Sequence, residues 1–172
     1  MDITFREAGT SDALCIGVLG TQVFLDTYAT EGIRPSVARE VLEYFSTDAI
    51  SALLSNPAIT FIVAELSGHM IGFAQVIYGS THELVAAGNT AELDRLYVQE
   101  RFSGKGIGAG LLRRAEAWAA EQGASAMWLT VWAENRRALA FYARQGYKDV
   151  GASVYVFEGD RYETRIFVRK SL

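Results

Sequence analysis

The first third of the chain changes from the period of a strand to the period of a helix. Residues 3–6 alternate apolar and polar side chains, as a half-buried strand does. Residues 10–12 then offer capping side chains, so we expect a helix from about Ala13 to Tyr28. A second helical stretch follows Pro35 and ends at Asn56-Pro57. The pattern therefore predicts two helices before the main sheet.

From residue 60 the period shortens to that of strands. Residues 61–64 and 71–78 are predicted strands of a hairpin, joined by the turn at 67–69. A further strand covers 91–98, but its apolar residues do not alternate cleanly, which indicates a bend or bulge midway. His69 and His82 lie in turn-like segments, and we expect both to be solvated.

The second half of the chain begins with a glycine-rich segment and a strongly amphipathic helix. The helix starts at Gly106, and Gly123 terminates it. A buried strand at 127–132 and a short helix at 135–145 follow, and strands at 150–157 and 163–170 flank a turn at 158–160. The apolar face of the amphipathic helix comprises Ile107, Leu111, Leu112, Ala115, Trp118 and Ala119.

Composition limits the classes of function. A chain of 172 residues that is 50% hydrophobic suits one domain spanning residues 1–172. A net charge of -4 without a Lys/Arg block argues against nucleic acid as a partner. Cys15 is the single cysteine, so we expect no intrachain disulfide, no metal and a reducing cytoplasm. No leader-like or membrane-spanning segment is apparent, so neither export nor membrane insertion is expected.

The glycine-rich segment, residues 103–108, is the strongest candidate for chemistry. A loop between a strand and a helix exposes N–H groups that suit a phosphate, although such a loop can also be a plain helix-starting turn. A Walker loop would need glycine at Gln99 and Ser or Thr at Gly106, so that motif fails twice. The dinucleotide pattern GxGxxA matches from Gly104 to Ala109, but it lies too far after the strand and lacks the later acidic residue.

Motifs along most of the chain resemble the GCN5-related N-acetyltransferase (GNAT) superfamily. They are residues 96–98, the segment 103–108, Asn135, Phe141-Tyr142 and Gly146-Tyr147, in that order. Residues 24–28, 128–132 and 169–172 look like the bacterial spermidine/spermine acetyltransferases. The resemblance implies an α/β (α+β) fold, with a mixed, mostly antiparallel sheet of about seven strands flanked by about four helices. It also implies acetyl-coenzyme A as cosubstrate.

The resemblance assigns the cofactor to two regions of the chain. Family members hold the pyrophosphate on the glycine loop, present the thioester beside the preceding strand, and touch the coenzyme A arm from the short helix. The family loop usually opens with Gln or Arg, where this chain has Ser103. Because backbone donors carry most of the binding, we expect only a modest loss. The implied cofactor residues are Leu96, Tyr97, Val98, Ser103, Gly104, Lys105, Gly106, Ile107, Gly108, Asn135, Ala138 and Tyr142.

Three residues are candidates for proton transfer. Tyr142 stands where family members protonate the coenzyme A sulfur, although a tyrosine in this setting is often core packing. Glu92 stands where histone-type members keep a base, and Asp94 lies on the same strand face. Both carboxylates could instead simply solvate an exposed strand, and a water relay is a third option for the base. Asn135 could equally be a helix cap.

The acceptor is the least defined part of the prediction. Phe24, Tyr28 and Trp132 could wall an amine cleft through cation–π contacts, or could be buried filler. A small cationic amine, polyamine first, is the expected substrate, with protein or peptide amines, amino acids and aminoglycosides as alternatives. A non-catalytic module that binds coenzyme A is the alternative of another class. Relatives also suggest a homodimer.

Overall fold

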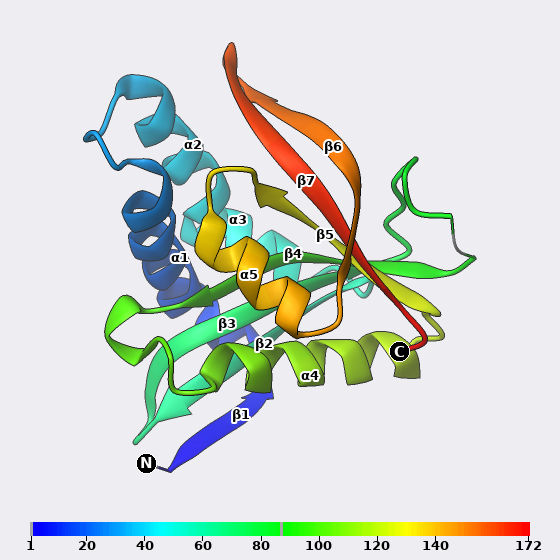
Figure 1. Cartoon of the computed structure of the whole chain (residues 1–172). Helices are drawn as coiled ribbons and strands as arrows, with labels where there is room; N and C mark the ends of the chain where they lie inside the picture. The colour runs from blue at the N-terminus through cyan, green and yellow to red at the C-terminus, as the bar shows by residue number, and fades with distance from the viewer. Residues whose placement is uncertain (1, 87) are drawn as a thin grey trace. The chain divides into compact units, whose positions relative to one another are not determined.

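The computed structural model describes residues 2–86 and 88–172. Its strands form a seven-stranded sheet in the order β1-β2-β3-β4-β5-β7-β6 (Figure 1). The strands are β1 (Ile3–Glu7), β2 (Ile59–Leu66), β3 (His69–Tyr78), β4 (Thr90–Val98), β5 (Ala126–Trp132), β6 (Lys148–Phe157) and β7 (Asp160–Lys170). The helices are α1 (Ala13–Tyr28), α2 (Pro35–Phe45), α3 (Thr47–Leu54), α4 (Ile107–Glu121) and α5 (Arg136–Arg144), with 3₁₀ turns η1 (Thr10–Asp12) and η2 (Glu100–Phe102).

The predicted fold class is confirmed, with a mixed and mostly antiparallel sheet. β1 pairs antiparallel with β2, and β7 pairs antiparallel with both β5 and β6, whereas β4 and β5 are parallel. The predicted bulge in the middle of β4 stays a prediction. Strand ends differ from the sequence prediction by up to three residues, because pairing extends strands past their apolar cores.

The prediction of a single helical stretch after Pro35 is wrong. Ser46 has an extended backbone (φ −61°, ψ 151°), so it ends α2 and caps α3. Its hydroxyl oxygen accepts the backbone N–H of Ala49 at 3.2 Å, as an N-cap side chain does. The described part of the chain therefore has five α-helices where about four were expected.

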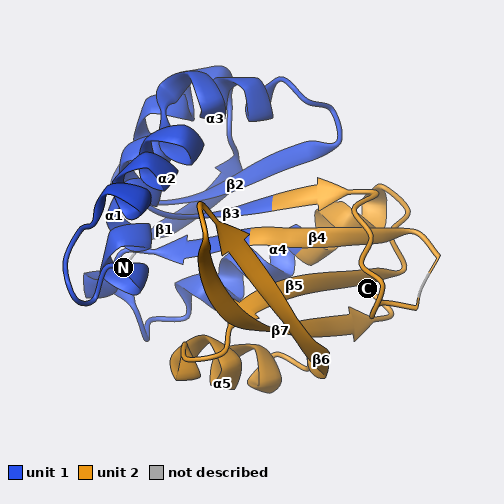
Figure 2. Cartoon of the chain, turned by 90° about the horizontal axis from the view of Figure 1, so that it is seen from above, with its two compact units in different colours: residues 1–75, 95–115 blue, residues 76–94, 116–172 orange. Residues whose placement is uncertain are grey.

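The chain divides into two compact units, coloured separately in Figure 2. Unit 1 comprises residues 1–75 and 95–115, and unit 2 comprises residues 76–94 and 116–172. In unit 1, helices α1 to α3 share a core with β2 and β3. In unit 2, a smaller core joins the loop before β4 to β5 and β7. The first core is Ala13, Ile16, Leu19, Val41, Phe45, Ile50, Phe61, Val63 and Phe73, and the second is Val85, Ala126, Trp128, Ile166 and Val168.

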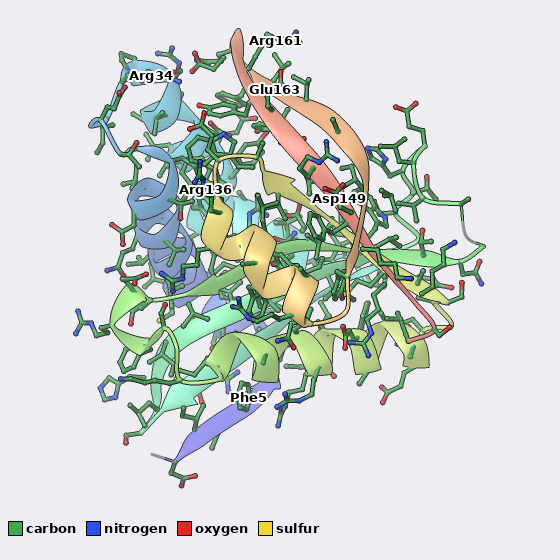
Figure 3. All side chains as sticks on the ribbon, in the orientation of Figure 1. Phe5, Arg34, Arg136, Asp149, Arg161 and Glu163 are labelled. Carbon is green, nitrogen blue, oxygen red and sulfur yellow. The ribbon has the colours of Figure 1, made fainter. Side chains whose placement is uncertain are left out.

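The first half of α4 is fixed within unit 1 by its contact with β1. Phe5 of β1 lies against this helix (Figure 3). A Cβ at Gly110 would lie 2.5 Å from Cζ of Phe5, so a larger residue at this position would force the Phe5 ring to move. The Arg114 guanidinium lies 4.0 Å from the centroid of the same ring, a cation–π distance. These contacts hold the helix that follows the glycine loop.

Strands β6 and β7, of 10 and 11 residues, form a hairpin in unit 2 (Figure 1). Its register shifts between Asp149 and Gly151, which is a bulge. The Asp149 carboxylate accepts two bonds from the Arg165 guanidinium, each 2.9 Å long, and this paired geometry spans the shifted register. Arg161 and Glu163 lie toward the turn at the far end of the hairpin (Figure 3).

Candidate active site

The glycine loop in unit 1 forms an open turn at the head of α4. Gly104 and Gly106 have φ values of +73° and +81°, a region that L side chains adopt only with strain. A backbone bond of 2.9 Å runs from the Gly110 N–H to the carbonyl of Gly106. The N–H groups that precede it at the helix start have no intrahelical acceptor. With the positive end of the helix dipole, they suit an anion such as a diphosphate.

Two residues of this loop, Ser103 and Lys105, make defined contacts with the preceding turn. Ser103 is half-buried, and its backbone N–H donates to the Glu100 carbonyl at 2.9 Å, which closes η2. The Lys105 ammonium donates to the carbonyl of Arg101 at 3.2 Å and lies 5.4 Å from the Phe102 ring centroid. The lysine charge therefore lies on the preceding turn, and the loop offers backbone N–H groups as its main donors.

The end of β4, residues Leu96, Tyr97 and Val98, is half-buried in unit 1. The Tyr97 ring packs against Phe73 and Phe45, with centroids 5.4 and 6.1 Å apart. Strand β3 approaches β4 closely here, and this approach requires glycine at position 72, because a Cβ on Gly72 would lie 2.7 Å from the Tyr97 carbonyl oxygen. This strand end is thus held firmly just before the glycine loop.

Glu92 lies at the start of β4, in unit 2, with its carboxylate held in place. Its Oε2 accepts a bond of 2.6 Å from the Ser80 hydroxyl. The parallel register pairs Glu92 with Trp128 of β5, and Glu92 is half-buried. Asp94, two residues along the same strand face, is exposed. The structure therefore distinguishes the two candidate bases by burial.

Tyr142 is buried on α5 in unit 2, with 8% of its surface exposed. Its ring meets Phe141 and Tyr147 edge to face, with centroids 5.1 and 5.8 Å apart. The Tyr147 hydroxyl donates to the Glu116 carboxylate at 2.9 Å, and Glu116 also accepts from Arg169 at 3.3 Å. Burial first, and then the charge of Glu116, raises the pKa of Tyr147 well above its usual range.

Asn135 acts as the N-cap of α5. Its side-chain oxygen accepts the Ala138 backbone N–H at 3.1 Å. The structure thus establishes the capping alternative for Asn135, and it places Ala138 in the same first turn. Contact of either residue with a cofactor stays a prediction.

The three aromatic residues predicted for the acceptor cleft lie in different units. In unit 1, Phe24 and Tyr28 are half-buried on α1, with ring centroids 4.7 Å apart. Phe24 also meets Phe45, at 5.8 Å between ring centroids. In unit 2, Trp132 meets Tyr162 edge to face at 6.5 Å. A role of the three in acceptor binding stays a prediction.

Sequence reasoning missed the partners of the candidate residues. Ser80 carries no motif, and only the folded loop reveals its bond to Glu92. His82 was expected to be solvated, but it is half-buried, and its ring lies 5.2 Å from Trp128 because the loop folds back over β5. The sequence pattern also gives no sign of the contact between Glu116 and Arg169, because the two residues are 53 positions apart in the chain.

Two kinds of feature are absent from residues 2–86 and 88–172. No helix in this part of the chain combines the length and apolar character that crossing a membrane requires. The same residues contain no group of three or more His, Cys, Asp or Glu side chains placed to hold a metal ion.

Comparisons with known proteins identify the family. The profile of the acetyltransferase (GNAT) family matches residues 25–147. The uncharacterized N-acetyltransferase YhfO of Bacillus subtilis is 30% identical over 147 residues, which cover 86% of this chain and 91% of the relative. An uncharacterized N-acetyltransferase of Lactobacillus delbrueckii subsp. lactis is 25% identical over 154 residues, 90% of this chain and 88% of the relative.

The fold matches solved structures over nearly its full length. The PaiA N-acetyltransferase of Thermoplasma acidophilum, solved in complex with coenzyme A, has a TM-score of 0.76 and 24% identity, and the match covers 99% of each chain. The family and these relatives are N-acetyltransferases, so the chain is an acyltransferase enzyme. The chain belongs to the acetyltransferase (GNAT) family.

Proposed function

We propose that this enzyme transfers an acetyl group from acetyl-coenzyme A to a primary amine of a small cationic substrate. The observation that carries the proposal is the open turn at Gly104 and Gly106, whose left-handed backbone leads directly into α4. Such a turn offers several N–H donors and a helix dipole to one diphosphate. A fold relative solved with coenzyme A supports the same cosubstrate here.

The proposed reaction needs one proton acceptor and one proton donor. The cosubstrate supplies a thioester, whose carbonyl carbon forms a bond to the amine nitrogen while the carbon–sulfur bond breaks. Glu92 takes the proton that the amine nitrogen loses, and the Tyr142 hydroxyl gives a proton to the departing thiolate. Glu92 is half-buried and held by Ser80, whereas Asp94 is exposed, so Glu92 is the base in this proposal. Solvent returns both groups to their starting protonation states.

Cationic amines are the proposed acceptors, and polyamines are the first to test. The net charge of -4 favours approach of a cation. Phe24 and Tyr28 present ring faces of the kind that attract ammonium groups. Protein or peptide amines, amino acids and aminoglycosides are the other acceptors for comparison.

A thiol-release assay tests the proposal. Purified protein is mixed with acetyl-coenzyme A and, in separate reactions, with polyamines, aminoglycosides, amino acids and peptides with free amines. We expect thiol release that depends on a polyamine and that matches the amount of acetylated amine seen by mass spectrometry. Binding of coenzyme A without turnover on any amine would support a non-catalytic module and contradict the proposal.

A further inference from the structure

Ser80 lies two residues after the end of β3, where three hydrogen bonds connect it to Glu92, β4 and β5. Its hydroxyl donates to Oε2 of Glu92 at 2.6 Å. Its carbonyl oxygen accepts one bond from the Thr90 hydroxyl at 2.6 Å and another from the Trp128 indole N–H at 3.0 Å. One residue therefore connects the loop, β4 and β5 within unit 2.

The anchors of Ser80 are buried, whereas its hydroxyl faces the carboxylate. Thr90 and Trp128 are 2% and 5% exposed, so water does not compete strongly for the two donors. The neighbouring Gly79 N–H donates to the Thr90 carbonyl at 2.8 Å, which fixes the backbone just before Ser80. The position of the hydroxyl is thus set by buried groups on β4 and β5.

We propose that Ser80 is a positioning residue for Glu92 in acetyl transfer. This inference rests on the proposed function, in which Glu92 accepts the amine proton. A glutamate side chain loses rotamer freedom when it is held, and the bond from Ser80 restricts it before substrate arrives. A hydrogen bond donated to a carboxylate also favours its ionised form, which is the form a base requires.

The chain offers a matched control beside the proposed residue. Thr81 is exposed, carries a hydroxyl and has no hydrogen bond in the described structure. Ser80→Ala removes the hydroxyl but keeps the carbonyl that Thr90 and Trp128 hold, so we expect the variant to fold. Ser80→Thr keeps a hydroxyl and should rescue the variant. Thr81→Ala tests whether any change in this loop has the same effect.

The test is the pH dependence of kcat and kcat/KM with acetyl-coenzyme A and the best amine. Ser80→Ala should lower kcat about tenfold and leave the KM for acetyl-coenzyme A unchanged. The acidic limb of the pH–rate profile, where activity rises as the base loses its proton, should move to higher pH because the ionised carboxylate has lost a hydrogen bond. Ser80→Thr should restore most of both properties, and Thr81→Ala should match wild type. An acidic limb that stays in place in Ser80→Ala would overturn the inference, and thermal unfolding confirms that each variant is folded.

A double-mutant cycle separates failure of the inference from failure of the proposed function. Glu92→Gln should lower kcat and abolish the acidic limb, and Ser80→Ala should then add little in that background. If the two losses multiply fully, Ser80 acts independently of Glu92, and the inference fails while the proposed function stands. If Glu92→Gln keeps wild-type turnover and pH dependence, the role of Glu92 fails instead.

Discussion

The glycine loop of unit 1 and the proton-transfer candidates of unit 2 are built in different ways. The loop is a run of six neighbouring residues, Ser103 to Gly108, and in the proposed function it binds the diphosphate through backbone N–H groups. In unit 2, Glu92 is held by the side chain of Ser80, 12 residues away, and Tyr147 beside Tyr142 is held by a carboxylate still farther along the chain. The bond from Tyr147 to Glu116 joins residues 31 apart, and the bond from Arg169 to Glu116 joins residues 53 apart.

Because the two regions are built differently, we expect substitutions in the loop and in unit 2 to affect different quantities. A substitution in the loop should change how tightly the cofactor binds, because backbone conformation sets its donors. A substitution in the side-chain clusters of unit 2 should change turnover or stability and leave cofactor binding intact. A loop variant that changes turnover without changing cofactor affinity, or a unit 2 cluster variant that weakens cofactor binding, would contradict this expectation.

The largest expected effect is on turnover. Tyr142→Phe removes the proposed proton donor, and we expect kcat to fall about 100-fold, within the range of general acid catalysis. The ring contacts with Phe141 and Tyr147 do not need the hydroxyl, so the fold and the coenzyme A affinity should persist. Steady-state kinetics together with calorimetric titration of coenzyme A measure the two quantities. Wild-type turnover would remove Tyr142 from the mechanism.

The next effect is on stability, in the network behind Tyr142. Tyr147→Phe leaves Glu116 without one of its donors while Arg169 remains. Loss of one bond to a partly buried carboxylate should lower the free energy of unfolding by about 1–3 kcal/mol. Urea unfolding measures this change. Tyr78→Phe, at a half-buried tyrosine of the same unit, is the control and should change stability little.

The same variant should change stability at alkaline pH. The pKa of Tyr147 is raised in the folded protein by burial and by Glu116, whereas the unfolded phenol ionises near pH 10, at about its usual pKa. The contribution of the neutral Tyr147 hydroxyl to the free energy of unfolding is therefore complete below about pH 10 and is lost as pH rises further. Wild type should lose up to about 1.4 kcal/mol more per pH unit than Tyr147→Phe in this range. Parallel curves above pH 10 would contradict the assignment.

The comparison also explains what could be predicted from the sequence. The glycine loop and its helix were predicted because the signal is local: glycines, then an apolar face with the helical period, including Ile107 and Leu111. The fold class was implied by the family resemblance, and the seven-stranded sheet confirms it. Asn135 was correctly given a capping role as one alternative, since N-caps depend on adjacent residues.

Features that depend on distant residues could not be predicted. The bond from Ser80 to Glu92 exists only because the loop after β3 folds onto β5, where Trp128 holds its carbonyl. His82 was assigned to solvent for the same reason, because its contact with Trp128 is formed by tertiary structure. The break at Ser46 was missed because the apolar period continues across it.

A smaller effect is expected from strain in the glycine loop. Gly106→Ala places an L side chain at φ +81°, which costs about 1–2 kcal/mol. The loop can relieve this strain by leaving its binding conformation, so the Kd for coenzyme A should rise about tenfold, as calorimetric titration would show. Gly159→Ala is the control at a similar φ of +88° in the β6–β7 turn. It should lower stability and leave coenzyme A affinity unchanged, and equal effects of both variants on affinity would contradict the role of the loop.

The smallest effect on coenzyme A affinity is expected from adding a charged side chain beside the backbone donors of the glycine loop. Ser103 stands where the family usually has Gln or Arg, and Ser103→Arg adds a charge beside the proposed diphosphate site. Because N–H groups and the helix dipole supply most of the attraction, the gain in coenzyme A affinity should be less than about threefold. Titrations at two salt concentrations measure the gain and its screening. A gain of a hundredfold would mean that side-chain charge, and not the backbone turn, controls binding in unit 1.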